Sequence, residues 1–284
     1  MPNKILRLGY TESSLLFYYW LNKYKNINTT EIIDNKKKWI KWLYTTSGYY
    51  DKCIVSTYFD AIHTEQDTEI YNEYMEKILQ FIKKSDNFNI HLHKYSINEH
   101  ITEFKEYYYS PNEYITQDEM FKFIKDKKIL IISPFSPLIK NQIENGNCKK
   151  IYKDTPSIDT IYTYKFPYTF FNKGPHNNIL ETTDYIYNDI NTNINNDYCS
   201  VLISCGAYGC LIAEKFYNNN KNVCVLGGDI QTFFGILNNR TKGQTINNKT
   251  TIVNKEYCIN EYWINVPDEY KPLGYEKIEG GCYW

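Results

Sequence analysis

Residues 199–226, CSVLISCGAYGCLIAEKFYNNNKNVCVL, contain the clearest supersecondary pattern of the chain. An apolar run at 199–204 precedes a glycine turn at 206–209, a segment of helical length at 210–217 and a second apolar run at 222–226. Two buried strands joined by a helical crossover lie parallel, because the crossover returns the chain to the same end of the sheet. The segment therefore predicts a βαβ unit with two neighbouring parallel strands.

Similar segments lie on both sides of this unit. Short apolar runs predict strands, and apolar residues at helical spacing predict helices. The strands are expected at 4–8, 88–92, 128–133 and 158–164, and the helices at 11–24, 31–44, 68–83, 135–144 and 177–190. Thr116 and Glu119 form a capping-box pattern that predicts one more helix start. This alternation predicts an α/β fold with a Rossmann-like parallel sheet flanked by helices.

The length of 284 residues allows one large α/β domain or two small ones, and no segment forces a division. We expect a single domain over 1–284. It would comprise an N-terminal strand and helices over 1–125, the Rossmann-like sheet core over 126–240 and an irregular C-terminal segment over 241–284. The polar stretch from Arg240 to Thr251 is the best candidate for a mobile loop.

Composition and charge exclude several classes of protein. Hydrophobic residues make up 42%, which is too many for a disordered chain. The net charge is −1, with lysines and acids interspersed, so the basic surface of a nucleic-acid binder is missing. No apolar stretch has the length of a transmembrane segment or a signal peptide, so we expect a cytoplasmic protein.

The metal-binding residue types form no strong pattern. The eight cysteines include no CxxC pair, and those in apolar runs, such as Cys53, Cys199, Cys205 and Cys224, are expected to be reduced core residues. His91 and His93 could ligate a metal from one face of a strand, but no third ligand stands nearby.

Arginine is the informative residue type. Of 32 basic residues only Arg7 and Arg240 are arginine, in a chain whose excess of Lys, Asn, Ile and Tyr is typical of an AT-rich coding sequence. A guanidinium retained against that bias indicates a role that needs its planar fork, most commonly bidentate binding of phosphate or carboxylate. A buried structural ion pair is the alternative for each arginine.

Ligands of open α/β sheets bind beyond the carboxyl ends of the strands. Four segments there carry glycine, small polar or charged residues: 7–12, 133–136, 206–209 and 227–231. Glycine turns allow backbone N–H groups to approach a phosphate, and the helix expected to start at Ala207 would add its positive end. Glycine at 206–209 alone is explained by turn geometry. Gly227-Gly228, Asp229 and Arg240 follow later in the chain. For all of these residues together, a site for the phosphate and ribose of one nucleotide is the better explanation.

Several motifs also resemble a known family. Arg7-x-Gly9-x-x-Glu12 resembles the opening signature of glycosyltransferases of the GT-D fold type. Four later stretches and two single residues resemble a bacterial group of polysaccharide-synthesis proteins with that architecture. The stretches are KKILIISPF at 127–135, SCGAYG at 204–209, LGGDIQTFFGI at 226–236 and EGGCYW at 279–284, and the single residues are Gln142 and Arg240. The matches cover nearly the whole chain, and Gly-Gly-x-x-Gln-x-x-Phe-Gly is the most specific.

The resemblance implies a glycosyltransferase that moves a sugar from a nucleotide-sugar donor, UDP- or another, to a glycan or saccharide acceptor. Family members commonly use Mn²⁺ or Mg²⁺, which better-studied members of the fold hold through an Asp-x-Glu motif. The nearest equivalent here is Asp229-Ile230-Gln231, in which a neutral amide replaces an acid, so Asp229 would hold a metal more weakly. Without a metal, Arg7, Arg240 and backbone amides would stabilise the leaving diphosphate.

The expected site follows from these motifs. Glu12, held beside Arg7, is the preferred catalytic base or binds hydroxyls of the donor sugar, and Asp229 is the second candidate base as well as the candidate metal ligand. The alternative for Glu12 is a helix-start acid paired with Arg7. The expected nucleotide-sugar-binding residues are Arg7, Gly9, Ser133, Gly206, Ala207, Tyr208, Gly209, Gly227, Gly228, Gln231 and Arg240.

The C-terminal tail at 278–284 is unusually aromatic. Tyr283 and Trp284 would expose apolar surface in a free tail, so the tail either packs near the site, offering a face for sugar stacking, or covers the core.

Two other functions are alternatives to a glycosyltransferase. One is a non-catalytic module that binds a nucleotide or glycan, and Gln231 favours it. A methyltransferase that uses S-adenosylmethionine would typically carry its glycine turn after the first strand of its sheet.

Overall fold

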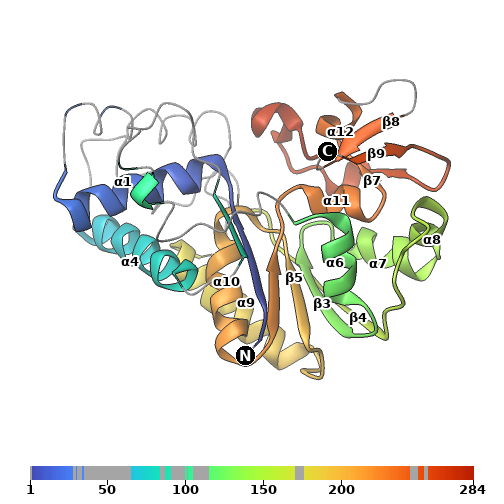
Figure 1. The fold of residues 1–284 in the computed structure, drawn as a ribbon, viewed down its shortest axis with the longest axis horizontal. Helices are drawn as coiled ribbons and strands as arrows, with labels where there is room; N and C mark the ends of the chain where they lie inside the picture. The colour runs from blue at the N-terminus through green and yellow to red at the C-terminus, as the bar shows by residue number, and fades with distance from the viewer. Residues whose placement is uncertain are drawn as a thin grey trace.

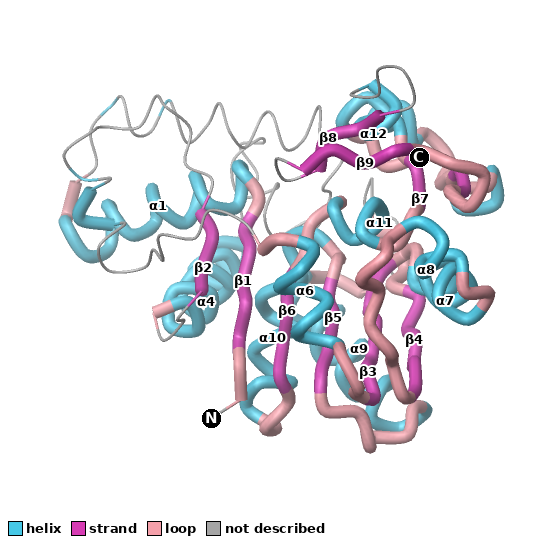
Figure 2. Tube along the Cα trace, turned by 45° about the vertical axis from the view of Figure 1, so that its right-hand side comes forward, coloured by secondary structure: helices cyan, strands magenta, loops and turns pink. Residues whose placement is uncertain are grey.

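A computed structural model of the chain describes residues 2–27, 30, 34, 65–83, 87–90, 100, 102–104, 115–169, 176–243, 249–252 and 255–284. Its centre is a six-stranded sheet (Figure 1). The strands lie in the order β2-β1-β6-β5-β3-β4, and every pairing is parallel (Figure 2). The strands are β1 (Lys4–Leu8), β2 (Asn87–Ile90), β3 (Lys128–Ser133), β4 (Thr160–Lys165), β5 (Ser200–Ile203) and β6 (Asn222–Val225). The predicted α/β fold with a parallel sheet is confirmed.

Helices cover both faces of the sheet (Figure 1). One face packs against α1 (Tyr10–Lys25), α4 (Glu65–Ile82), α9 (Ile179–Asn193) and α10 (Gly209–Asn218). The other packs against α6 (Gln117–Ile124), α7 (Ser136–Glu144) and α8 (Asn147–Ile151). Leu130 and Ile132 of β3 face the first group, whereas Ile129 and Ile131 face the second. Burial on both faces explains why β3 is a continuous apolar run.

Local sequence signals place several elements as expected. Thr116 caps α6, accepting a hydrogen bond from the backbone N–H of Glu119 while the carboxylate of Glu119 accepts one from the N–H of Thr116. The unit β5–α10–β6 forms the predicted βαβ crossover, with β5 and β6 paired directly. The helix expected at 31–44 and the residues His91 and His93 lie outside the described residues.

The C-terminal part is more regular than its sequence suggests. After β6 the chain forms α11 (Asp229–Phe233), β7 (Ile236–Leu237), α12 (Asn239–Gly243), β8 (Lys249–Ile252), β9 (Lys255–Cys258) and β10 (Ile264–Asn265). β8 pairs antiparallel with β9, and β10 pairs parallel with β7. The prediction of a mobile loop at 240–251 is therefore wrong for the residues that the structure describes, because residues 240–243 lie in α12 and residues 249–251 lie in β8.

Tertiary packing explains this regularity. Trp263, Val266, Ile278 and Trp284 are buried in the same hydrophobic cluster as α6 and α7, so scattered apolar residues without periodicity find partners across the fold. Among the cysteines expected in the core, Cys205 and Cys224 are buried but Cys199 is exposed, and Cys53 lies outside the described residues. None of the described helices combines the length and the apolar character needed to cross a bilayer.

Candidate functional site

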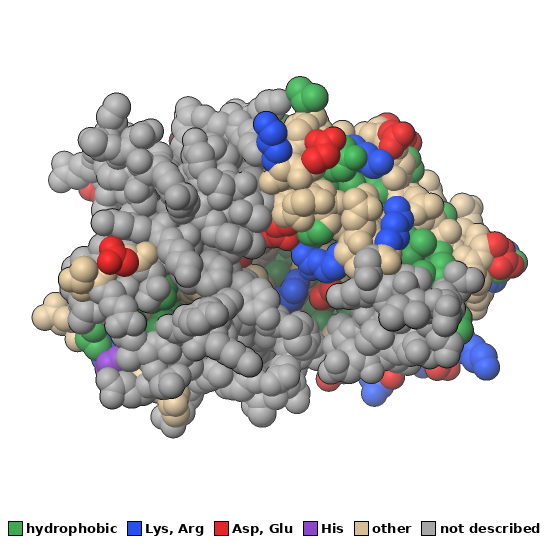
Figure 3. All heavy atoms as spheres, turned by 90° about the horizontal axis from the view of Figure 1, so that it is seen from above, with side chains coloured by type: hydrophobic (Ala, Val, Ile, Leu, Met, Phe, Trp, Pro, Cys, Tyr) green, Lys and Arg blue, Asp and Glu red, His purple; other side chains and the backbone are tan. Residues whose placement is uncertain are grey.

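A cavity of about 400 Å³ opens at the carboxyl edge of the sheet. Chain segments that follow β1, β3, β4, β5 and β6 line it together with the C-terminal tail. The lining residues are Arg7, Gly9, Glu12, Pro134, Phe135, Phe166, Pro167, Tyr168, Thr169, Ser204, Cys205, Gly206, Tyr208, Val225, Leu226, Gly227, Gly228, Gln231, Arg240, Glu279, Tyr283 and Trp284. Figure 3, which looks onto this edge, shows basic and acidic side chains side by side near the centre of the molecule. Parallel α/β sheets bind their ligands at this edge.

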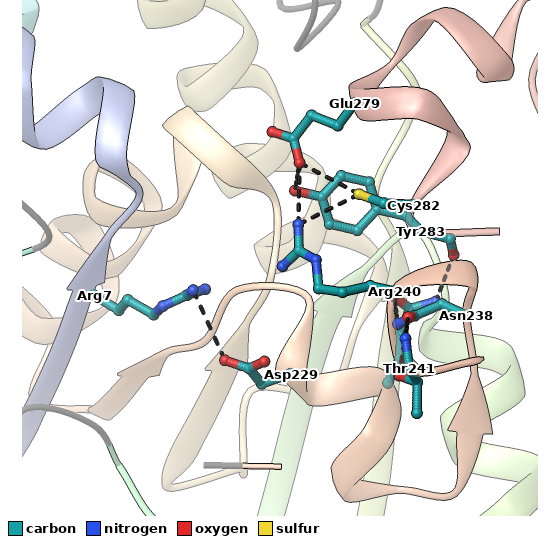
Figure 4. Close-up of polar contacts among 9 residues, drawn as sticks. Arg7, Asp229, Asn238, Arg240, Thr241, Glu279, Cys282 and Tyr283 are labelled. Atoms are coloured by element: carbon teal, nitrogen blue, oxygen red, sulfur yellow. Dashed lines mark hydrogen bonds and ion pairs between the residues drawn. The ribbon is translucent and has the colours of Figure 1, made fainter. Parts of the chain in front are cut away.

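Arg7 extends from β1 across the start of the segment after β6. A Cβ atom on Gly227 would lie 1.3 Å from Nη1 of Arg7, so Gly227 gives the guanidinium its space. Nη2 of Arg7 lies 3.8 Å from Oδ2 of Asp229, an ion pair too long for a hydrogen bond (Figure 4). Nε of Arg7 is buried and has no hydrogen-bond partner among the described residues. Within that part of the chain, the guanidinium therefore retains donors that its contacts do not use.

Arg240 reaches the neighbouring glycine from α12. A Cβ atom on Gly228 would lie 2.9 Å from Cε1 of Tyr283 and 3.9 Å from Nη1 of Arg240. The two guanidiniums of the chain thus converge on adjacent residues, 227 and 228, from β1 on one side and α12 on the other (Figure 4). The side chains of Arg7 and Tyr283 lie against Gly227 and Gly228. Close packing therefore explains why both positions are glycine, and the sequence alone did not reveal this.

Glu279 joins Arg240 to the tail. Its Oε2 accepts hydrogen bonds from Nη2 of Arg240 at 3.1 Å, from the hydroxyl of Tyr283 at 3.0 Å and from Sγ of Cys282 at 3.3 Å (Figure 4). The guanidinium of Arg240 also lies over the ring of Tyr283, 5.2 Å from its centroid. Sequence reasoning included Glu279 only in the tail motif and gave it no role, because the partner arginine stands 39 residues away in the chain.

Glu12 lies in the first turn of α1 and is partly buried in the cavity. A Cβ atom on Gly9 would lie 2.5 Å from Oε2 of Glu12, so Gly9 makes room for this carboxyl group. Burial raises the pKa of Glu12 above its ordinary value of 4.5, and the charge of Glu279 adds to the rise. A hydrogen bond to its own backbone and the charge of Arg7 act in the opposite direction. Arg7 acts on Glu12 through its charge, but the ion pair that the described residues show for Arg7 is with Asp229 rather than with Glu12.

Three of the expected binding residues do not line the cavity. Ser133 is fully buried, and its Oγ accepts a hydrogen bond from the backbone N–H of Phe135. The carbonyl of Ala207 accepts a hydrogen bond from the hydroxyl of Tyr74. A Cβ atom on Gly209 would lie 2.9 Å from Cγ1 of Val225, so this glycine allows α10 to pack closely on the sheet. Each therefore has a structural role.

The other expected residues of the first glycine turn do line the cavity. Gly206 has a φ of 55°, in the left-handed region that glycine tolerates best. Tyr208 is buried, and its ring centroid lies 5.1 Å from that of Phe166. The turn between them forms a 3₁₀ helix over Gly206–Tyr208, and α10 begins at Gly209 rather than at 207.

Gln231 lines the cavity, but its amide holds the tail. Its Nε2 donates to the carbonyl of Tyr283 at 2.9 Å, and its Oε1 accepts from Nδ2 of Asn238 at 3.1 Å. Trp284, which is 3% exposed, donates from Nε1 to the carbonyl of Tyr270 and fills the adjacent core. Of the two aromatic residues of the tail, Trp284 therefore covers the core and also lines the cavity, while Tyr283 stands over Gly228.

The oxygen donors at and near Asp229 have contacts within the protein. Asp229 faces Arg7, and the amide oxygen of Gln231 is already engaged. Within the described part of the chain no three His, Cys, Asp or Glu side chains are grouped as metal ligands. The role of Asp229 as a metal ligand remains a prediction, and the chemistry proposed below uses only groups of the protein.

The cavity thus combines two arginines, two carboxyl groups and a largely aromatic wall. It could bind a ligand that has a strongly anionic part, hydroxyl groups and an apolar ring face. A comparison of the chain with protein-family models, with curated proteins and with solved structures gives no match in any of the three.

Proposed function

We propose that this chain is a nucleotide-sugar-dependent glycosyltransferase, which transfers a sugar from a nucleoside-diphosphate sugar to a saccharide acceptor. The observation that supports it is the convergence of the only two arginines, Arg7 and Arg240, at the carboxyl edge of a parallel sheet. Guanidinium groups with unused donors bind phosphate oxygens strongly. The resemblance of the motifs to GT-D glycosyltransferases points to the same donor class.

In this reaction the bond between the anomeric carbon and the diphosphate breaks, and a bond from an acceptor hydroxyl oxygen to that carbon forms. Negative charge grows on the leaving diphosphate, where Arg7 and Arg240 would stabilise it. The hydroxyl proton passes to the carboxylate of Glu12. Because burial raises the pKa of Glu12, its ionised form is a stronger base than an exposed glutamate. The rings of Phe135, Phe166 and Tyr168 supply apolar surface for the nucleobase or the sugar of the donor.

The test is turnover, measured as release of nucleoside diphosphate from a panel of nucleotide sugars with oligosaccharide acceptors. Glu12→Gln should lower turnover by about 100-fold or more, the usual contribution of a general base. Asp268→Asn is the matched control, because this side chain is 93% exposed and lies outside the cavity. If Glu12→Gln and Asp229→Asn both kept full turnover, the assignment of the base would be wrong.

A non-catalytic binding module is the second candidate. The engagement of Gln231 with the tail favours it, because an acid that would hold a catalytic metal is absent at that position. Binding of a nucleoside diphosphate to the wild-type protein without release from any nucleotide sugar would support the module over the transferase.

A further inference from the structure

Glu279 has an unfavourable backbone conformation at the wall of the cavity. Its φ is 48°, in the left-handed region that non-glycine residues rarely adopt because it is sterically unfavourable for them. Gly280 and Gly281 follow with φ values of 66° and 71°, so three successive residues are left-handed. Such strain persists where surrounding contacts hold it in place and is common at ligand sites. The turn directs a glutamate to a cavity-lining position.

The contacts of this carboxylate are asymmetric. All three described hydrogen bonds, from Arg240, Cys282 and Tyr283, end on Oε2. Among the described residues none donates to Oε1, although a carboxylate oxygen has two acceptor sites. The side chain is 19% exposed and lines the cavity. Oε2 is therefore fixed by the protein, and Oε1 is open to a donor from a ligand.

The charges of the cavity give the ligand a direction. A phosphate would be repelled by Glu279 and attracted to Arg7, which lies against Gly227. Arg240 stands between these regions, with Nη2 on Glu279 and Nη1 near Gly228. The ring of Tyr283 covers Gly228 on the same side as Glu279. The diphosphate end of a nucleotide sugar fits beside Arg7, and its sugar end fits beside Glu279.

We propose that Glu279 binds a hydroxyl group of the transferred sugar, with Oε1 accepting the hydrogen bond. Tyr283 and Arg240 are the positioning residues, because they fix Oε2 and hence the direction of Oε1. This inference rests on the proposed function and deepens it, since it assigns the sugar-binding end of the cavity.

The experiment compares two ligands that differ only by the sugar. Calorimetry gives the dissociation constants of UDP and UDP-glucose, and likewise of GDP, ADP and dTDP with their glucose esters, for the wild-type protein and for Glu279→Gln. The wild type should bind one sugar ester more tightly than its diphosphate. Glu279→Gln should reduce that ratio by about tenfold, the loss expected for a hydrogen bond to a charged group, while the diphosphate alone binds at least as tightly as before.

Glu276→Gln is the matched control, because Glu276 lies on the same tail, is exposed and does not line the cavity. Tyr283→Phe keeps the ring but removes the hydroxyl that holds Oε2, so it should reduce the same ratio several-fold, and it carries the test if Glu279→Gln fails to fold. If Glu279→Gln weakens the binding of the diphosphate and of the sugar ester equally, or weakens the binding of neither, the role of Glu279 is overturned and the proposed function still stands. If the wild type binds no member of the panel, both proposals fail.

Discussion

At the scale of single residues, Glu12 links the stability of the fold to its proposed chemistry. Burial raises the pKa of Glu12, so the folded chain holds this proton more tightly than the unfolded chain does. Ionising Glu12 therefore costs stability as the pH rises from 4.5 through the raised pKa, and the cost is absent below that window. A group kept at a cost in stability, in a cavity, is a candidate for function.

We therefore predict that Glu12→Gln is more stable than the wild type at pH 7.5, although it is the less active protein. The difference in melting temperature should shrink as the pH falls and disappear near pH 4, where both chains carry an uncharged side chain at this position. Circular dichroism melts from pH 4 to pH 8 measure it. A difference that is the same at every pH would mean that titration of Glu12 is not its cause.

The two arginines show what composition can reveal and what it cannot. Their scarcity predicted that both have a special role, and the structure places both in one cavity. Their partners could not be predicted, because the sequence suggested a pair of Arg7 with Glu12, whereas the folded chain pairs Arg7 with Asp229 and Arg240 with Glu279. These contacts join residues hundreds or tens of positions apart, which no local pattern encodes.

At the scale of elements, α10 depends on a close approach to the sheet. A Cβ atom at position 209 would lie 2.9 Å from Cγ1 of Val225 and 3.9 Å from Cγ2 of Ile203. We predict that Gly209→Ala lowers the free energy of unfolding by about 1–3 kcal/mol, as overpacking of a tight core does. Urea unfolding of Gly209→Ala, Val225→Ala and the double variant tests this.

The double variant should be less destabilised than the sum of the two single variants, since removing the Val225 methyl groups relieves the clash. Simple additivity, or an unchanged stability of Gly209→Ala, would contradict this explanation.

The segment 227–235 illustrates the limit of motif reading at this scale. Its glycines and its glutamine suggested a ligand cradle, but each has a packing partner: Gly227 makes room for Arg7, Gly228 for Tyr283, and Gln231 holds the backbone of the tail. Gly235 has a φ of 72°, and a Cβ atom there would lie 2.2 Å from Cδ1 of Ile151. These residues of the motif thus form part of the cavity wall and hold neighbouring side chains and the tail in place.

At the scale of the whole molecule, strand order creates the site. The sequence predicted a parallel sheet from apolar runs and crossover length, and this is what the structure shows. It could not predict that β1 lies between β2 and β6, because strand order depends on contacts between distant segments. That placement brings Arg7 beside Gly227, and the packing of the tail then brings Glu279 and Tyr283 to the same edge.

Nucleotide binding is tested most directly by a thermal-shift measurement of the intact protein with nucleoside diphosphates and nucleotide sugars, each with and without Mn²⁺. We expect one nucleotide to stabilise the wild type without Mn²⁺, by about 2.7 kcal/mol at a hundred times its dissociation constant. Arg7→Lys should lose most of this shift, whereas Lys242→Gln, which changes an exposed cation on α12, should keep it. A wild-type protein that responds to no nucleotide would contradict the claim that this cavity binds a nucleotide sugar.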